Sequence, residues 1–563
     1  MKSYNKITGF TQVLFVILLV FTGCTDKYKE MNTNPSLVSE DLVPPEFLLT
    51  AVQYGIGSGL GASDISNYCG MEVRGDNSPF IDHFDDWAWN VSFTSFGNNL
   101  AAIIRKTKDD PELVNKKAIA RILKVWVFAQ CTDIYGDIPY FDANKDPNDA
   151  VLTPKYDTQK SIYEDFFKEL KEAAAELDAS KASFGSADLY YGGDVTKWRK
   201  FANSLRLRLA LRLRYVDEQM AKSNISDLQD ADLITSRSDD AAIYTANDIE
   251  EHRNGMYNSV ANGYDPAERQ DYLDHQHVGK ALLDALVGSS SPVNPLDPRT
   301  KVIADTAVLN GAKLNPARAP FGFRAQPLLG VVPVENKYPY GFGSISNFSL
   351  FWYVPVIERP ILKSSEVYFA LAEAALFNLR NSGSDAATYF KKGIEASVIE
   401  IQDLYNTGKA QIPEVLKLVF GDNVDVDKYL DYKEMKQSQI DAFLASSATT
   451  LTGANNEEKL EQIMNQKIIA LYPNGLEGWS EWRRTGYPRV LVAANEQSTF
   501  QGVAPRRQHY PNNEKLINTV NNKEAVDRIG GVDDMMKKVW WDANPNAPHK
   551  HPGTVESRCC PWL

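Results

Sequence analysis

Cysteine is scarce in this sequence, with five residues among 563, at positions 24, 69, 131, 559 and 560. No two of them form a C-x-x-C pair, and none lies near a histidine at the spacing of a zinc site. The sequence therefore carries no recognisable zinc or thioredoxin-type motif. A disulfide between Cys69 and Cys131 would need an oxidising compartment, and the sequence alone does not decide whether it forms.

Positive charge is also in deficit. The chain has 60 Lys and Arg residues against 73 Asp and Glu residues, which gives a formal net charge of -13 and a pI of about 5.2. A general binder of the nucleic-acid backbone carries an excess of positive charge, so this class of protein is disfavoured. An uncharged or peptide-like ligand is compatible with the balance. Hydrophobic residues make up 43% of the chain, which is too many for a disordered protein.

The apolar run near the start is too short to span a membrane. It extends from Val13 to Phe21, whereas a spanning helix needs about 20 apolar residues. Lys2 and Lys6 precede it, and the letters "TGC" follow it, ending at Cys24. This pattern predicts a lipoprotein signal peptide over residues 1–23, with Cys24 as the lipidated N-terminus. An ordinary secretory signal with a chance cysteine is the alternative. Residues 24–45 are polar, contain prolines and read as a tether.

Most of the periodic segments are helical. In "DTQKSIYEDFFKELKEAAAEL" one apolar stripe comprises Ile162, Phe166, Leu170, Ala173 and Leu177. Asp157 precedes this segment and is the expected N-cap. "SSEVYFALAEAALFN" and "SDAATYFKKGIEASVIEI" predict a helical hairpin, and "NNEEKLEQIMNQKIIALY" predicts a further helix. The expected fold is mainly α, with helix pairs that lack a clean 34-residue repeat.

The segment "SLRLRLALRLRYV" alternates apolar and charged residues, as a strand would. Leu and Arg nevertheless favour helices over strands. Apolar residues from Trp198 to Leu213 also follow a helical stripe, so we predict a helix over residues 196–217. Its arginines are expected on a solvated or ion-paired face rather than on nucleic acid.

Residues 55–99 and 240–360 are rich in turn-forming residues and weak in periodicity, which is typical of long functional loops. A sugar ring binds a flat aromatic side chain with its C–H face, and amides, carboxylates or guanidinium groups with its hydroxyls. These two regions supply such side chains. The candidate ligand-binding residues are Arg74, Asp76, Asn77, Trp87 and Trp89 in the first region, and Tyr338, Tyr340, Phe342, Trp352 and Tyr353 in the second. For each aromatic residue the alternative is core packing.

Four stretches in order resemble the SusD/RagB family of outer-membrane nutrient-binding lipoproteins. They are "CTDIYGDIPYFD", "WRKFANSLRLRLALRLR", "PILKSSEVYFALAEAAL" and "QKIIALYPNGLEGWSEWRRTGYPRV", the last followed by "RRQHYPNNEKLIN". The resemblance implies a SusD-like domain over residues 46–541, with tetratricopeptide-like helix pairs as a scaffold for long irregular loops. Residues 542–563 form a tail that does not look like the family.

The resemblance also implies a function. It implies a cell-surface lipoprotein of the outer membrane that binds oligosaccharides, or in some members peptides. It implies a SusC-type TonB-dependent transporter as partner, and neither catalysis nor a cofactor. A lipid-anchored glycoside hydrolase is the alternative from another class. It would need two carboxylates flanking the scissile bond, and no motif isolates such a pair.

Two acidic motifs could be mistaken for sites. In "EGWSEWRRTGYP" we expect Glu477, Trp479, Trp482, Arg483 and Arg484 to serve the scaffold, as packed rings and satisfied ion pairs. The aspartates after the first family motif, Asp133, Asp137, Asp142 and Asp146, lack the D-x-D-x-D-G pattern of a calcium loop. We therefore predict no metal site.

Overall fold

The computed structural model describes residues 42–549, apart from 60–62, 75–85, 147–148, 266–267, 270–272, 274–275, 288–294, 306–347, 382, 423 and 491–503. Helices dominate these residues, which confirms the prediction of a mainly α fold. The predicted signal peptide, Cys24 and most of the tether lie outside them. Among the residues that the structure describes, no helix has the length and apolar character needed to span a bilayer.

The described residues contain a long series of helices, joined by connections of very different lengths. The α-helices are α3 (Pro45–Gly59), α4 (Ser63–Tyr68), α5 (Trp87–Asn90), α6 (Gly97–Thr107), α7 (Val114–Tyr135), α8 (Gln159–Glu176), α9 (Val195–Arg212), α10 (Glu218–Ile225), α11 (Gly255–Ala261), α13 (Lys280–Val287), α14 (Thr300–Ile303), α15 (Ser364–Leu376), α16 (Ala386–Gly408), α17 (Ile412–Phe420), α18 (Val426–Lys433), α19 (Gln437–Leu444), α20 (Asn456–Leu471), α21 (Gly475–Thr485), α22 (Asn512–Ile517) and α23 (Thr519–Arg528). A π-helical turn, η2 (Val91–Phe96), joins α5 to α6, and a 3-10 turn, η10 (Leu350–Tyr353), precedes β4.

Four short strands form two separate antiparallel pairs. The strands are β1 (Glu72–Arg74), β2 (Ala241–Tyr244), β3 (Gln276–Val278) and β4 (Glu358–Leu362). β1 pairs with β3, so that Glu72 lies opposite Val278, and β2 pairs with β4. Each pair joins segments that are far apart in the sequence and so ties loop-rich regions to the helices.

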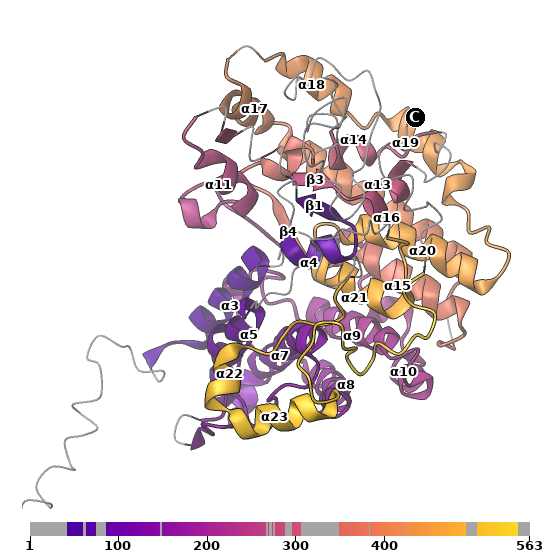
Figure 1. Cartoon of the computed structure of the whole chain (residues 1–563). Helices are drawn as coiled ribbons and strands as arrows, with labels where there is room; N and C mark the ends of the chain where they lie inside the picture. Colours follow the sequence, from indigo (N-terminus) through magenta and orange to yellow (C-terminus); the bar gives the residue numbers. More distant parts are fainter. Residues whose placement is uncertain are drawn as a thin grey trace, which may run out of the picture.

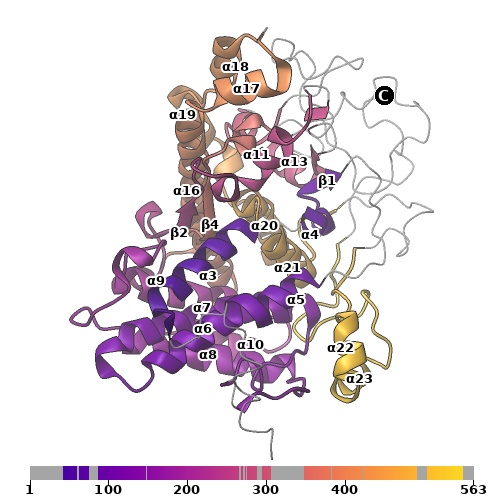
Figure 2. The same ribbon diagram turned by 90° about the vertical axis from the view of Figure 1, so that its left-hand side faces the viewer.

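Consecutive helices pack as antiparallel neighbours. α6 packs on α7, α7 on α8, α8 on α9 and α9 on α10, while α15 packs on α16 and α20. The predicted hairpin of α15 and α16 is therefore confirmed. Figures 1 and 2 both place α7, α8 and α9 toward one end of the molecule and α17 and α18 at the other. A single cluster of buried apolar residues runs through the structure, from Leu49 to Trp541.

Helix α8 shows why the apolar pattern and the cap were not equally predictable. All five residues of the predicted apolar stripe are buried. The N-cap, however, is Thr158, whose hydroxyl accepts a hydrogen bond from the Ser161 amide at 3.3 Å. The prediction of Asp157 was wrong. Its carboxylate instead accepts hydrogen bonds from the amides of Tyr140 and Phe141, at 2.9 and 2.8 Å, and so holds the chain that follows α7.

The segment of alternating Leu and Arg is helix α9, as predicted, and it ends at Arg212. The expectation of a solvated arginine face was wrong, because Arg206, Arg208 and Arg212 are all at least 95% buried. Helix α9 is enclosed by other elements, including α8, α10 and α15. The alternative of an ion-paired face is confirmed, since Arg206 binds Asp227 at 2.8 Å and the other two have carboxylate partners described below.

The loop-rich regions contain more helix than expected where they are described. Residues 86–99 run continuously through α5, η2 and the start of α6. The sequence left open whether Cys69 and Cys131 form a disulfide. In the structure both are buried, unpaired thiols. Burial raises the pKa of the Cys69 thiol to about 12, so it stays protonated and unreactive at neutral pH.

Candidate ligand-binding surface

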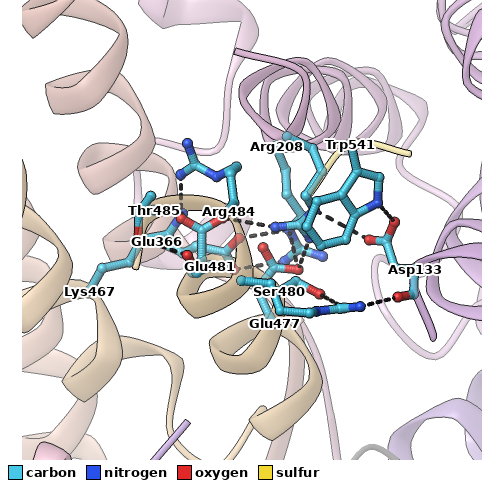
Figure 3. A network of polar contacts seen from close by, with 12 residues as sticks. Asp133, Arg208, Glu366, Lys467, Glu477, Ser480, Glu481, Arg484, Thr485 and Trp541 are labelled. Carbon is cyan, nitrogen blue, oxygen red and sulfur yellow. Dashed lines mark hydrogen bonds and ion pairs between the residues drawn. The ribbon is translucent and has the colours of Figure 1, made fainter. Parts of the chain in front are cut away.

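Charged side chains of α9 and α21 meet inside the protein. Arg212 donates hydrogen bonds to Glu481 at 2.8 Å and to Glu477 at 2.7 Å. Arg208, one turn earlier on α9, donates two hydrogen bonds to Glu366 of α15, at 2.6 and 2.7 Å. Figure 3 shows these side chains converging from several helices. We call this set, together with the residues of the next paragraph, the buried ionic cluster.

Helices α15 and α20 complete the cluster. Arg484 donates two hydrogen bonds to Glu373, at 2.6 and 2.7 Å, and one to Glu481 at 2.5 Å. Lys467 lies 3.2 Å from the same Glu481. Arg484 and Glu373 have no exposed surface at all. Each charge therefore has an opposite charge in contact, which is the condition for burying it.

A second set of contacts ties the cluster to α7 and to the end of the described chain. Asp133 accepts hydrogen bonds from the Tyr163 hydroxyl at 2.5 Å and from the Trp541 indole at 2.7 Å. Its backbone carbonyl accepts a hydrogen bond from Arg483 at 2.6 Å. The Arg483 guanidinium lies 3.5 Å from the centre of the Trp479 ring, which is a stacked cation–π contact.

The electrostatics of the cluster rule it out as an acid–base pair. Burial would raise the pKa of Glu481, but the charges of Arg484, Lys467 and Arg212 outweigh this effect and lower it below its ordinary range. The pKa of Glu477 is lowered in the same way. Both carboxylates stay ionised at neutral pH and are closed off from ligands, whereas a glycosidase needs one protonated acid beside its substrate. The predicted scaffold role of this motif is confirmed, with Trp482 only 2% exposed.

The buried ionic cluster makes the stability of the fold depend on pH. Glu373, Glu477 and Glu481 have depressed pKa values, so they stabilise the fold above the unfolded-state value of about 4.3. That contribution is lost as the pH falls through the folded-state values. We expect the free energy of unfolding, measured by urea denaturation, to fall steadily as the pH drops below about 4.5. Equal stability at pH 7 and pH 3 would contradict this account.

The structure separates the predicted ligand residues into exposed and buried ones. Trp87 is 45% exposed, so its ring is available to a ligand. Trp89 is 6% exposed and packs edge-on against Tyr135, with ring centres 5.3 Å apart. Trp352 is 5% exposed and meets the ring of Tyr472 edge-on at 4.6 Å.

These two rings are mostly buried and pack against aromatic neighbours, although Trp89 also lines the larger groove described below. Trp87 and Trp89 lie two positions apart on one helical turn, so the two rings point in different directions and only one can face the core. Tyr353 is also fully buried. Arg74 is the last residue of β1, opposite Gln276. The side chain of Arg74 and the residues Asp76, Asn77, Tyr338, Tyr340 and Phe342 lie outside the described part of the chain.

Trp87 borders a small apolar pocket rather than a deep cavity. The pocket has a volume of about 50 Å³ and is lined by Ile56, Ile65, Trp126 and Gln508, among others. A space of this size holds a few water molecules at most. Trp87 therefore offers a flat, partly exposed ring on which a sugar could stack, at the edge of this small apolar pocket.

A larger groove opens on the other face of the α5–η2 segment. It has a volume of about 460 Å³ and shares no lining residue with the Trp87 pocket. Its walls come from α5 and η2, from the chain after α7 and from the start of α22. Sequence reasoning missed its polar residues Asn90, Asn98, Asn144 and Asn513, because they come from three separate segments. The only local signal was the repeated asparagine in "WNVSFTSFGNN".

The four aspartates after the first motif do not form a metal site. Asp133 is 3.3 Å from Arg212, Asp137 is 2.6 Å from Arg528, and Asp142 is 2.6 Å from Lys145. Each of these three carboxylates has its own cationic partner. Across the described part of the chain, no group of three or more His, Cys, Asp or Glu side chains is arranged to hold a metal ion.

Comparison with known proteins agrees with this architecture. The model of the SusD-like_2 family, described as starch-binding and associating with the outer membrane, matches residues 75–511. A solved chitin-binding protein is 29% identical, with a TM-score of 0.71, and the match covers 89% of this chain and 100% of that one. A SusD homologue from Bacteroides uniformis is 26% identical, with a TM-score of 0.62, and the match covers 88% and 99% of the two chains.

A chitin-binding SusD homologue from Flavobacterium johnsoniae shares the fold at 23% identity, with a TM-score of 0.64, and the match covers 89% and 98% of the two chains. No curated protein is detectably similar in sequence. The family model spans most of the chain, and its neighbours match over nearly their full length. The chain therefore belongs to the SusD-like family.

Proposed function

We propose that this protein is a non-catalytic lipoprotein of the outer membrane. It binds oligosaccharides at the cell surface and delivers them to a SusC-type TonB-dependent transporter. The observation that carries the proposal is the match of residues 75–511 to a family described as starch-binding and associating with the outer membrane. The description of a 29% identical relative as a chitin-binding protein supports a glycan as the ligand.

The described surface supports the same conclusion. Trp87 presents an exposed ring on one face of the α5–η2 segment, and a groove rich in amide side chains lies on the other face. Aromatic rings and amides are the two kinds of group that bind a sugar. The paired carboxylates that could suggest hydrolysis are buried and held ionised by arginines. A neutral glycan held by stacking and hydrogen bonds that compete with water should bind with a dissociation constant of about 1 μM to 1 mM.

Isothermal titration with chitin and starch oligosaccharides tests the proposal. We expect heat of binding with at least one of these series, and no release of reducing ends on prolonged incubation. Affinity should be the same at low and high salt, because a neutral ligand has no charge attraction to screen. If the protein binds members of a peptide library and no glycan, its ligand is a peptide, and the proposed importer role still stands. Release of reducing ends would favour a hydrolase.

Truncating the exposed tryptophan should weaken glycan binding. We expect Trp87→Ala to raise the dissociation constant about tenfold, or about 1.4 kcal/mol, because a stacking surface is lost without opening the core. Tyr244, which is 53% exposed on β2, offers a matched control, and Tyr244→Ala should leave the titration unchanged. Equal glycan affinity of the wild type and Trp87→Ala would show that Trp87 does not contact the ligand.

Delivery requires a complex with the transporter. We expect the transporter to co-purify with the tagged lipoprotein from detergent-solubilised outer membranes. Deletion of the gene should slow uptake of the bound oligosaccharide. Uptake at the wild-type rate in the deletion strain would argue against a role in delivery.

A further inference from the structure

The groove beside η2 has the composition of a sugar-binding site in its own right. Its volume of about 460 Å³ falls within the range of about 300–1,000 Å³ that is typical of small-molecule sites. Figures 1 and 2 both show α22 close to α5, so two distant segments of the chain form its sides. The groove lies on the face of α5–η2 that Trp87 does not occupy. π-helical turns such as η2 are frequent at functional sites.

The polar lining can bind hydroxyl groups. Asn90 and Asn513 line the groove, and their side-chain amides donate no hydrogen bond to any other residue that the structure describes. Both residues are exposed, on opposite walls. An amide offers two donors and one acceptor, so it can match a sugar hydroxyl in either direction. Thr94 also lines the groove and is exposed.

Apolar surfaces complete the lining. Phe93 and the rings of Pro139, Pro154 and Pro511 line the same groove. Proline rings and an aromatic ring give rigid, weakly hydrated patches against which the C–H face of a sugar can lie. The alternation of apolar patches and amides matches the two kinds of surface that a sugar ring presents.

The groove has little uncompensated charge. Asp142 is 2.6 Å from Lys145. Glu514 accepts hydrogen bonds from the Tyr156 hydroxyl at 2.9 Å and from Asn518 at 3.1 Å. The charges of Asp142 and Lys145 cancel, and the one remaining carboxylate, Glu514, is held by neutral hydrogen-bond donors. A groove with a single negative charge disfavours an anionic ligand, so we expect a neutral one.

Hydrogen bonds hold the walls in place before any ligand arrives. The Asn144 amide donates to the Phe93 carbonyl at 2.7 Å and to Asn98, and the Asn144 carbonyl accepts from Arg105 at 3.0 Å. At the other end of the same loop, Asn518 donates to the Pro154 carbonyl at 2.8 Å. A site whose walls are fixed loses less entropy when it binds a ligand.

From these contacts we propose that the groove is a second glycan subsite, separate from the Trp87 surface, with room for about one or two neutral sugar rings. The inference rests on the proposed function, because it assigns a second part of the same ligand to a defined place. A glycan chain longer than a disaccharide could then occupy both faces of α5–η2, or two short glycans could bind independently.

Filling the groove tests the proposal. Thr94→Met places a long, non-aromatic side chain in the groove, and Ser95→Met is the matched control, because Ser95 is the next residue, is exposed and does not line the groove. Titration with the tetrasaccharides of chitin and starch should show two sites in wild type and in Ser95→Met, and one in Thr94→Met. Combining Thr94→Met with Trp87→Ala should leave one site, weakened about tenfold. Thermal melting of each variant establishes that it is folded.

A gentler double variant, Asn90→Ala with Asn513→Ala, should weaken the groove site at least tenfold without filling it. A single site in wild type that Thr94→Met leaves unchanged would overturn the groove subsite while the proposed function stands. Loss of peptide binding, rather than glycan binding, in Thr94→Met would overturn the assignment to sugars. If neither the wild type nor any variant binds a glycan, the proposed function itself is wrong.

Discussion

Replacing Arg484 by methionine is expected to lower the free energy of unfolding by about 3–5 kcal/mol. The side chain is fully buried and bridges Glu373 and Glu481 through three hydrogen bonds of 2.5–2.7 Å. Methionine fills much of the same volume but leaves two carboxylates without this partner in the interior. Removing one member of a buried pair is costly because the remaining charge keeps its desolvation penalty. Urea denaturation at pH 7 measures the change.

Arg489 gives a matched control for that experiment. It pairs with Glu461 at 2.6 Å, but its side chain is 35% exposed. Arg489→Met should therefore cost only about 0.2–1 kcal/mol, as exposed ion pairs usually do. Similar losses for the two variants would mean that the buried cluster does not contribute more than a surface pair.

Cys24→Ala is expected to abolish acylation and with it stable attachment to the membrane. The prediction follows from the short apolar run that ends in Thr-Gly-Cys, and Cys24 lies outside the described residues. Each buried CH₂ of an acyl chain contributes about 0.8 kcal/mol, so two or more chains hold a protein on its membrane almost permanently. Metabolic labelling with palmitate should mark the wild type and leave Cys24→Ala unlabelled.

Two controls sharpen the lipidation experiment. Cys560→Ala changes a cysteine in the C-terminal tail, and it should keep the full label. A variant whose residues 1–24 are replaced by an ordinary cleavable secretory signal should appear in the soluble fraction, correctly folded by its melting temperature. Equal labelling of wild type and Cys24→Ala would show that the acyl chains, if any, are attached elsewhere.

Helix existence was predictable from the sequence because apolar periodicity reports which face is buried. The stripe of α8, the hairpin of α15 and α16, and the helical character of α9 all follow from local spacing. What local spacing does not report is the partner. Arg208 and Arg212 read as a solvated face until Glu366, Glu477 and Glu481 are brought to them from distant helices.

The candidate site was harder to predict for the same reason. Trp87 and Trp89 belong to one short stretch, and composition makes them equivalent. Only the packing of Tyr135 against Trp89 shows that one ring is committed to the core while the other is exposed. The groove depends on Asn90, Asn144 and Asn513, which are brought together by the path of the chain rather than by any motif. The cap of α8 was missed because Asp157 and Thr158 are both good caps, and tertiary contacts decided between them.

The buried ionic cluster also makes the fold sensitive to whether the chain is complete. Arg212 reaches Glu477 and Glu481 across 265 and 269 residues, and Glu373 depends on Arg484 across 111. A chain that ends before α21 would hold arginines and glutamates with no counter-charge, which a closed interior does not tolerate. Such a fragment stays open and exposed to proteases, whereas the full chain closes. We therefore expect the chain to bury this core only once α21 is present.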